Sequence, residues 1–166
     1  MPAKTIGIEM NLGYEGNYAR TPDCIIMARK AAAAIGFGMP VILNTDNTWA
    51  PFGGSNTAAQ FAGVAVREVK QATNYADQNH VGYAAGDPCD VLERGNIVVK
   101  CGKGDPTAGG KVYIRKALND SYPDQVIGSF EAAADSTNTV ELTNAYWTTG
   151  KKDSHGMAEI TIKYKA

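Results

Sequence analysis

Residues 160–165 of the chain read Ile-Thr-Ile-Lys-Tyr-Lys, and apolar and polar side chains alternate throughout. Successive side chains of a β-strand point to opposite faces of its sheet, so this alternation predicts a strand with one buried face. Residues 96–101, Asn-Ile-Val-Val-Lys-Cys, follow a glycine and place Ile97, Val99 and Cys101 on one face. The two stretches together predict a half-buried β-sheet.

Strand signals of the same kind recur along the rest of the chain. Lys111–Arg115 follows two glycines and places Val112 and Ile114 on one face. Further runs of β-branched and aromatic residues are bounded by Gly, Pro, Asn or Asp; they are Val41–Asn44, Phe61–Glu68, Cys89–Leu92, Val126–Ala132 and Thr139–Thr143. About eight short strands at this spacing predict an all-β fold, a single β-barrel or jelly-roll-like domain.

The length of 166 residues suits one domain with one core. A chain of this size buries about 68–70% of its unfolded surface, so it needs no disulfide or metal ion to hold its core together. The strand positions that are expected to point inward predict the core residues Val64, Val91, Ile97, Val99, Val112, Ile114, Phe130, Ile160 and Ile162.

Two stretches allow two interpretations each. Asp23–Ile35 contains helix-forming residues, and Asp23 after Pro22 could cap a helix, yet a weak alternation also fits an extended conformation. Gln71–Val81 is polar, which is typical of a surface loop or of a short helical turn.

Composition and charge exclude several classes of protein. The chain has 16 Lys and Arg residues and 17 Asp and Glu residues. The resulting net charge of -1 argues against binding nucleic acid or a membrane through charge. The apolar runs are far shorter than the about 20 residues of a membrane-spanning helix. No stretch of signal-peptide length opens the chain, so we expect synthesis and folding in a cytoplasm. Cys24, Cys89 and Cys101 form no C-x-x-C pair and are expected to be reduced, structural thiols.

The motifs that resemble chemical sites are weak. Residues 102–111 are rich in Gly and end in Lys, but a phosphate-binding loop needs Gly where Asp105 stands and Ser or Thr where Val112 stands. His80 and His155 lie 75 positions apart, without a second ligand at helical or turn spacing. The sequence therefore predicts no catalytic residue, no metal site and no cofactor.

Trp49, Phe52 and Trp147 stand in loop-like contexts, which raises the hypothesis of exposed aromatic contacts. Rings that share one exposed face can stack on sugars or on bases. The alternative is that each ring fills one end of the barrel or a contact between subunits. The alternative is the more common arrangement for one aromatic side chain per loop.

The first 20 or so residues are rich in Gly and Asn and lack a pattern that would bury one face. They predict an extended N-terminal arm that, at about 3.3 Å per residue, reaches on the order of 65 Å. We expect residues 6–21 to be poorly ordered in the free protein. The apolar side chains that could anchor this arm in a partner are Ile8, Met10, Leu12, Tyr14 and Tyr18. The chain is accordingly divided into residues 1–38, the arm and first extended segment, and residues 39–166, the β-barrel domain.

An ordered set of short motifs covers most of the chain. It comprises Gly13-x-x-Gly16-x-x-Ala19, Ile35-Gly-Phe37-Gly38, Phe61-Ala-Gly63-Val64-Ala65, Tyr83-x-x-Gly86-Asp87-x-x-x-Val91, Gly95-Asn-Ile97-Val-Val99, Gly109-x-x-Val112-Tyr113-Ile114, Ile127-Gly-Ser-Phe130, Ala145-x-Trp147 and Gly156-x-Ala158-Glu-Ile160-x-Ile162. In this order the motifs resemble those of the capsid cement, or head decoration, proteins of tailed bacteriophages.

The resemblance implies a non-enzymatic β-module on the outer capsid surface of a virion, synthesised in the host cytoplasm. It implies that the major capsid protein is the partner, that neighbouring subunits are bridged, and that the arm is a tether. It also favours a strand over residues 24–30. Exposed strand edges and the three-fold positions of capsids favour a homotrimer over a dimer. The alternative is a ligand- or carbohydrate-binding β-module of a virion or tail.

Overall fold

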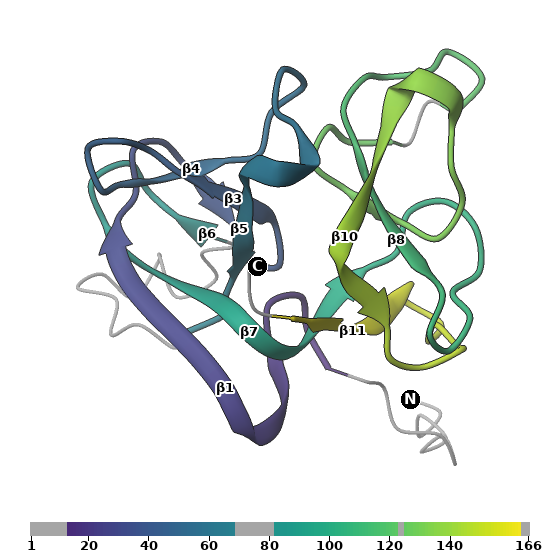
Figure 1. Ribbon diagram of the computed structural model, residues 1–166, viewed down its shortest axis with the longest axis horizontal. Helices are drawn as coiled ribbons and strands as arrows, with labels where there is room; N and C mark the ends of the chain where they lie inside the picture. Colours follow the sequence, from purple (N-terminus) through teal and green to yellow (C-terminus); the bar gives the residue numbers. More distant parts are fainter. Residues whose placement is uncertain (1–12, 69–81, 123–124, 164–166) are drawn as a thin grey trace, which may run out of the picture.

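The computed structural model describes residues 13–68, 82–122 and 125–163 (Figure 1). Strands dominate these ranges, which confirms the all-β expectation. The strands are β1 (Tyr18–Lys30), β2 (Ile35–Gly36), β3 (Pro40–Leu43), β4 (Trp49–Pro51), β5 (Phe61–Ala65), β6 (Gly82–Tyr83), β7 (Pro88–Lys100), β8 (Lys111–Arg115), β9 (Phe130–Glu131), β10 (Thr139–Trp147) and β11 (Met157–Ile162). The short 3-10 helices η1 (Ala58–Gln60) and η3 (Ser136–Asn138) lie between strands.

β7 is the central strand of a curled sheet that has nine strands in the described part of the chain. The hydrogen-bonded order is β4-β3-β5-β7-β11-β10-β8-β9, and β1 also pairs with β7. The first half of β7 lies between β5 and β1, which both pair with Leu92, whereas the second half pairs with β11. β1–β6 therefore form a first lobe and β8–β11 a second lobe, on the two sides of β7 (Figure 1).

Both ends of the sheet curl back. Trp49 of β4 forms a bridge with Ala31, directly after β1, and Phe130 of β9 forms a bridge with Cys101, directly after β7. This half-barrel curl supports the barrel expectation in part. The two stacked four-stranded sheets of a jelly roll are not found among the described residues.

The predicted core is confirmed, since each of its nine residues is at most 1% exposed. The larger core cluster runs from Phe61 in the first lobe to Phe130 in the second, and the two rings meet edge to face at 6.5 Å. A smaller cluster fills the first lobe around Trp49. Successive side chains of β7 reach opposite faces, so Leu92 enters the larger cluster and Val91 the smaller one. β7 therefore joins the two clusters.

Residues 24–30 lie in the second part of β1, so the extended interpretation is confirmed and the helical one is wrong there. The register runs from Ile26↔Leu92 to Lys30↔Pro88 and is shifted between Arg20 and Ile25. Pairing with β7 hydrogen-bonds this segment and packs Cys24 and Ile26 against the larger core cluster, and this outweighs a weak local helix preference. β1 lies within the expected segment 1–38, and it pairs with β7, which lies within the expected domain 39–166.

The predicted strand Val126–Ala132 is wrong over most of its length, because only β9 forms there. The φ angle of Gly128 is 87°, and the amide of Ser129 donates a hydrogen bond to the carbonyl of Val126 at 3.0 Å. A left-handed residue within a tight turn ends a strand. The stretch Gln71–Val81 lies outside the described residues, so both of its interpretations stay predictions.

Candidate interaction surface

Exposed large hydrophobic side chains are found mainly in two segments of the described chain. Tyr14 and Tyr18 lie in residues 13–18, here called the N-terminal segment. The connection between β8 and β9, here called the 116–129 loop, is described except for residues 123–124 and carries the exposed Leu118, Tyr122, Val126 and Ile127. In Figure 1 the loop lies in the upper part of the second lobe and the N-terminal segment lies low in the view, so the two are well separated.

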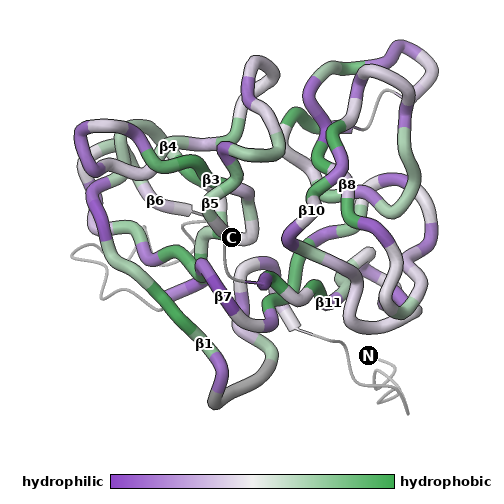
Figure 2. The backbone as a smooth tube through the Cα atoms, viewed as in Figure 1, coloured by the Kyte–Doolittle hydropathy of each residue, from purple (hydrophilic) through white to green (hydrophobic). Residues whose placement is uncertain are grey.

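Other apolar stretches of the chain belong mostly to strands. Figure 2 shows them as green sections, for example along β3 and in the middle of β1. Met27 of β1 and Leu43 of β3 are also exposed, but they stand singly on their strands. Single exposed hydrophobic residues are normal on a protein surface, whereas the 116–129 loop carries four of them.

The N-terminal segment is attached to the sheet through its backbone. The amide of Gly16 donates to the carbonyl of Val98, the amide of Val98 donates to the carbonyl of Asn17, and the amide of Arg67 donates to the carbonyl of Gly16, each at 2.8 Å. Gly16 has a φ of 81°, and a Cβ atom there would lie 2.8 Å from backbone atoms of three neighbours. Only glycine allows this approach.

Cation–π contacts complete the attachment. The Arg67 guanidinium carbon lies 5.0 Å from the ring centroid of Tyr14 and 5.3 Å from that of Phe37. The Tyr14 side chain nevertheless remains 67% exposed, so most of its ring is available to a partner. The expectation of a poorly ordered arm as far as residue 21 is therefore wrong for residues 16–21, because Gly16 and Asn17 bond to β7 and β1 begins at Tyr18.

The remaining predicted arm anchors, Ile8, Met10 and Leu12, lie outside the described residues. Of the predicted anchors, the described ones are Tyr14 and Tyr18, and both are exposed. Their role in contacting a partner stays a prediction.

The described residues of the 116–129 loop are hydrogen-bonded to one another and to the end of β8. The amide of Gly128 donates to the carbonyl of Arg115 at 2.8 Å and closes the base of the loop. Within the loop, the amide of Tyr122 donates to the carbonyl of Asn119 at 2.8 Å. A Cβ on Gly54 would lie 2.6 Å from the Lys116 carbonyl oxygen, so the loop also packs against the first lobe.

The sequence analysis did not identify this loop as an exposed apolar segment. It assigned the stretch from Val126 to a strand, although two adjacent apolar residues, Val126 and Ile127, cannot both face inward from one strand. That break in alternation, next to Gly128, was the signal for an exposed turn.

A buried ion pair stands at the base of the loop. Arg115 and Glu131 pair across β8 and β9, and both side chains are 0% exposed. The Arg115 Nε donates to Glu131 Oε1, and its Nη2 donates to Glu131 Oε2 at 2.8 Å, which makes the pair bidentate. Its Nη1 donates to the carbonyl of Ala117 at 3.0 Å, and so reaches the start of the loop directly.

Asp135 extends the ion pair to the middle of the loop. It lies 2.9 Å from Arg115 Nη2, and it accepts from the Asn119 side-chain amide at 3.1 Å. The hydrogen bond from Asn119, then that from Arg115, and the charge of Lys103 hold the pKa of Asp135 below its usual value. The hydrogen bond to Glu131 shifts the pKa of Arg115 in the opposite direction, above its usual value. Lys103 also lies 3.8 Å from the centroid of the Tyr122 ring.

The predicted exposed aromatic contacts are wrong. Trp49 and Trp147 are fully buried and Phe52 is 3% exposed, so all three belong to the core. The Trp49 indole donates to the carbonyl of Met27 at 3.2 Å, and the guanidinium of Arg29 covers its ring at 4.5 Å. The rings cannot form a sugar-stacking face, because β-strand neighbours cover them.

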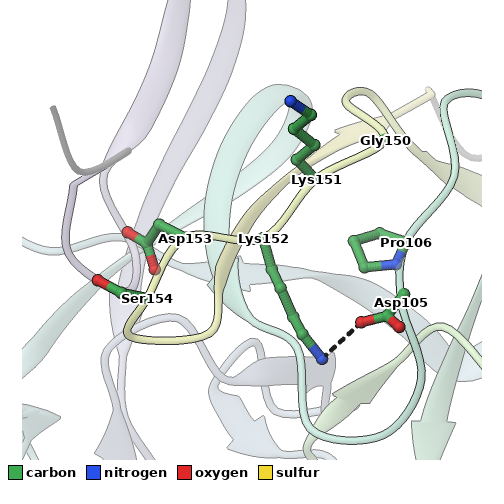
Figure 3. A pocket seen from close by; sticks show the side chains of 7 residues that line it. All are labelled: Asp105, Pro106, Gly150, Lys151, Lys152, Asp153 and Ser154. Atoms are coloured by element: carbon green, nitrogen blue, oxygen red, sulfur yellow. Dashed lines mark ion pairs between the residues drawn. The ribbon is translucent and has the colours of Figure 1, made fainter. Parts of the chain in front are cut away.

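A cleft of about 400 Å³ lies between residues 105–106 and 150–154 (Figure 3). Figure 3 shows Lys152 reaching toward Asp105, with Lys151 directed away from it. The ion pair between Lys152 and Asp105 measures 2.9 Å, and Lys152 also donates to the carbonyl of Gly104 at 3.0 Å. The lysine that faces the cleft is therefore engaged within the chain.

The cysteines are free thiols, as predicted, with Cys89 and Cys101 buried. Burial raises the pKa of Cys101, and burial together with the charge of Asp23 raises that of Cys24. Both effects favour the thiol over the reactive thiolate. In the described ranges, no three His, Cys, Asp or Glu side chains gather as a metal site would require. No helix in those ranges is long and apolar enough to cross a membrane.

The family whose model matches residues 1–163 is described as structural cement protein (E217 gp24/Pam3 gp6). The chain belongs to this family of phage cement proteins. The resemblance found in the sequence motifs is thereby confirmed. A phage cement protein is a structural protein of the virion, and it associates with capsid proteins.

The fold of this cement protein is similar to that of a chain in the solved structure "The capsid of Myoviridae Phage XM1". The TM-score is 0.69 at 14% sequence identity, and the alignment covers 98% of the cement protein and 97% of that chain. At this identity the likeness is one of fold. The comparison with curated proteins gave no match.

Proposed function

We propose that this cement protein binds the outside of the phage head and stabilises contacts between subunits of the major capsid protein. The observation that carries the proposal is the N-terminal segment. Its backbone is fixed to β7 at Gly16 and Asn17, while the Tyr14 and Tyr18 side chains face outward. A segment that is fixed to the sheet and exposes aromatic rings is suited to continue as a tether onto a neighbouring protein.

Ile8, Met10 and Leu12 precede the N-terminal segment and are proposed to enter an apolar groove of the major capsid protein. Each fully buried large side chain contributes about 1.5–3 kcal/mol, which three such anchors can set against the ordering of the arm. Because a head carries many copies, modest affinity per copy is sufficient.

A homotrimer is proposed as the assembled state. In the described residues β1 pairs with β7 and has no second neighbouring strand along its length. A strand with one unpaired edge gains hydrogen bonds by meeting another copy. Light scattering at micromolar concentration tests this directly: three times the chain mass is expected, and a monomer on its own and on the head would contradict it.

The test of head binding uses the full chain and purified heads that lack this protein. The variant Ile8→Ser/Met10→Ser/Leu12→Ser should bind these heads more than tenfold more weakly than the natural chain, measured by co-sedimentation. The matched control Glu9→Gln/Asn11→Ser changes interleaved polar residues and should bind normally. If the natural chain does not co-sediment with the heads, the proposed function is wrong. If the natural chain and the triple variant both bind normally, the arm has no part in attachment.

A further inference from the structure

We propose that Arg67, beside the N-terminal segment, binds an acidic side chain of the major capsid protein, an inference that rests on the proposed head binding. The Arg67 guanidinium carbon lies 5.0 Å from the ring centroid of Tyr14 and 5.3 Å from that of Phe37. Arg67 is half-buried, whereas Tyr14 is 67% exposed. The guanidinium therefore lies next to an aromatic ring that a partner can reach.

Arg67 differs from the other arginines in its charged neighbours. Each other arginine whose side chain the structure describes forms an ion pair with an Asp or a Glu; they are Arg29, Arg94 and Arg115. Among the described residues, no Asp or Glu forms such a pair with Arg67. The two aromatic rings attract its positive charge, but the usual acceptor for the five guanidinium N–H groups is an oxygen atom.

A carboxylate is the group that fits this guanidinium best. It accepts two parallel hydrogen bonds from one guanidinium and neutralises its charge at the same time. A neutral carbonyl oxygen would accept a hydrogen bond and leave the charge uncompensated. Because a partner that covers Tyr14 would also remove water from Arg67, the charge would then need an opposite charge beside it. The partner surface therefore carries an Asp or Glu side chain at this place.

The location of Arg67 favours the capsid protein over a second copy of the chain. Arg67 contacts the ring of Tyr14, which belongs to the N-terminal segment. Leu12, two residues earlier in the chain, is proposed to enter the capsid protein. A capsid protein that holds Leu12 lies close to Tyr14, and so it also lies close to the guanidinium.

The core holds Arg67 in position before any partner binds. Phe37 is 7% exposed, and its ring meets that of the buried Tyr83 edge to face at 5.2 Å. The Tyr83 hydroxyl donates a hydrogen bond to the carbonyl of Val66 at 2.6 Å, and the amide of Arg67 donates to the carbonyl of Gly16 at 2.8 Å. A group that is already in place loses less conformational entropy on binding, which raises its affinity.

The experiment uses the full chain and heads that lack this protein. Arg67→Met removes the guanidinium but keeps a flexible side chain that can lie against both rings. Arg94→Met is the matched control, because Arg94 already pairs with Asp23 at 2.9 Å and both side chains are exposed. Circular dichroism and thermal melting first establish that both variants are folded. If Arg67→Met does not fold, Arg67→Lys replaces it, since lysine keeps the charge but cannot donate the two parallel hydrogen bonds.

Co-sedimentation at low salt should give about tenfold weaker binding for Arg67→Met and less than about twofold change for the control. The natural chain should also lose affinity more steeply than Arg67→Met between about 50 and 500 mM NaCl, because salt screens attraction between charges. On heads whose surface carboxylates have been converted to amides, the natural chain and Arg67→Met should bind equally.

A purely structural role for Arg67, as a support for the Tyr14 ring, gives different results. The tenfold difference would then persist on the amidated heads, and the two proteins would show parallel salt dependences. Either result overturns the inference.

The remaining outcomes separate the inference from the proposed function. If the natural chain does not bind heads, the proposed function fails and the inference fails with it. If the natural chain and Arg67→Met bind untreated heads equally well, the role of Arg67 alone is overturned. An oligomer that dissociates upon Arg67→Met, with unchanged head binding, assigns the acidic partner to a second copy and overturns the inference too.

Discussion

The N-terminal segment and the 116–129 loop both present hydrophobic side chains to solvent, but they are held in different ways. Gly16 fixes the first through backbone hydrogen bonds and a close approach to the sheet. Arg115, Glu131 and Asp135 fix the second through charged side chains. Backbone attachment depends on one residue's lack of a side chain and is insensitive to charge. Ionic attachment depends on every partner keeping its charge.

The largest effect should come from removing one buried charge beneath the loop. Glu131→Gln leaves the guanidinium of Arg115 without its bidentate carboxylate, and we expect a loss of about 3–5 kcal/mol in the free energy of unfolding. Urea denaturation measures it. The control Glu141→Gln breaks the exposed pair with Lys111, which should change stability by less than about 1 kcal/mol. Similar losses in both variants would contradict the structural role assigned to the buried pair.

A smaller effect is expected from adding a side chain at the root of the N-terminal segment. Gly16→Ala combines a left-handed φ of 81° with a Cβ 2.8 Å from backbone atoms, and should lower stability by about 2–4 kcal/mol. Gly109→Ala is the matched control, since its φ is 75° and no atom lies within 4 Å of its Cβ. It should lose only about 1–2 kcal/mol. Equal losses in thermal or urea unfolding would mean that the close approach contributes nothing.

The smallest effect should appear on acidification. Because the folded-state pKa of Asp135 is lowered, chiefly by the hydrogen bond from Asn119, its contribution to stability is complete above the ordinary carboxyl pKa of about 3.9. That contribution is lost as the pH falls below this value through the folded pKa. Asp135→Asn cannot titrate, so between about pH 5 and pH 3 it should lose less stability than the natural chain. Identical pH dependence of urea midpoints in both proteins would refute this linkage.

Local patterns were sufficient to predict the strands with strict alternation. Val112 and Ile114 are buried in β8, whose bounds Lys111–Arg115 were predicted from the sequence, and Ile160 and Ile162 are buried in β11. The reason is physical: alternation places all apolar side chains on one face, and only one register buries that face. The same reasoning gave no way to choose between a helix and a strand for residues 24–30.

The candidate contact site was predictable only in part. Tyr14 and Tyr18 were identified as exposed anchors because no local pattern would bury them, and both are exposed. The loop was not identified, because its shape depends on Arg115 meeting Glu131 and Asp135, which lie 16 and 20 positions further along the chain. Charged residues are usually solvated, so nothing in their spacing indicated that these would be buried.

The sequence by itself determined the β-class, the core residues and the family of this protein. The first two follow from the short-range alternation of apolar and polar residues, and the family follows from the order of local motifs. Only the tertiary structure decided that β1 is a strand, that Trp49 and Trp147 are core residues, and that a charged cluster supports an apolar loop. These features arise from contacts between residues far apart in the chain. Their energies come from pairing, burial and charge neutralisation that exist only after the sheet has curled around β7.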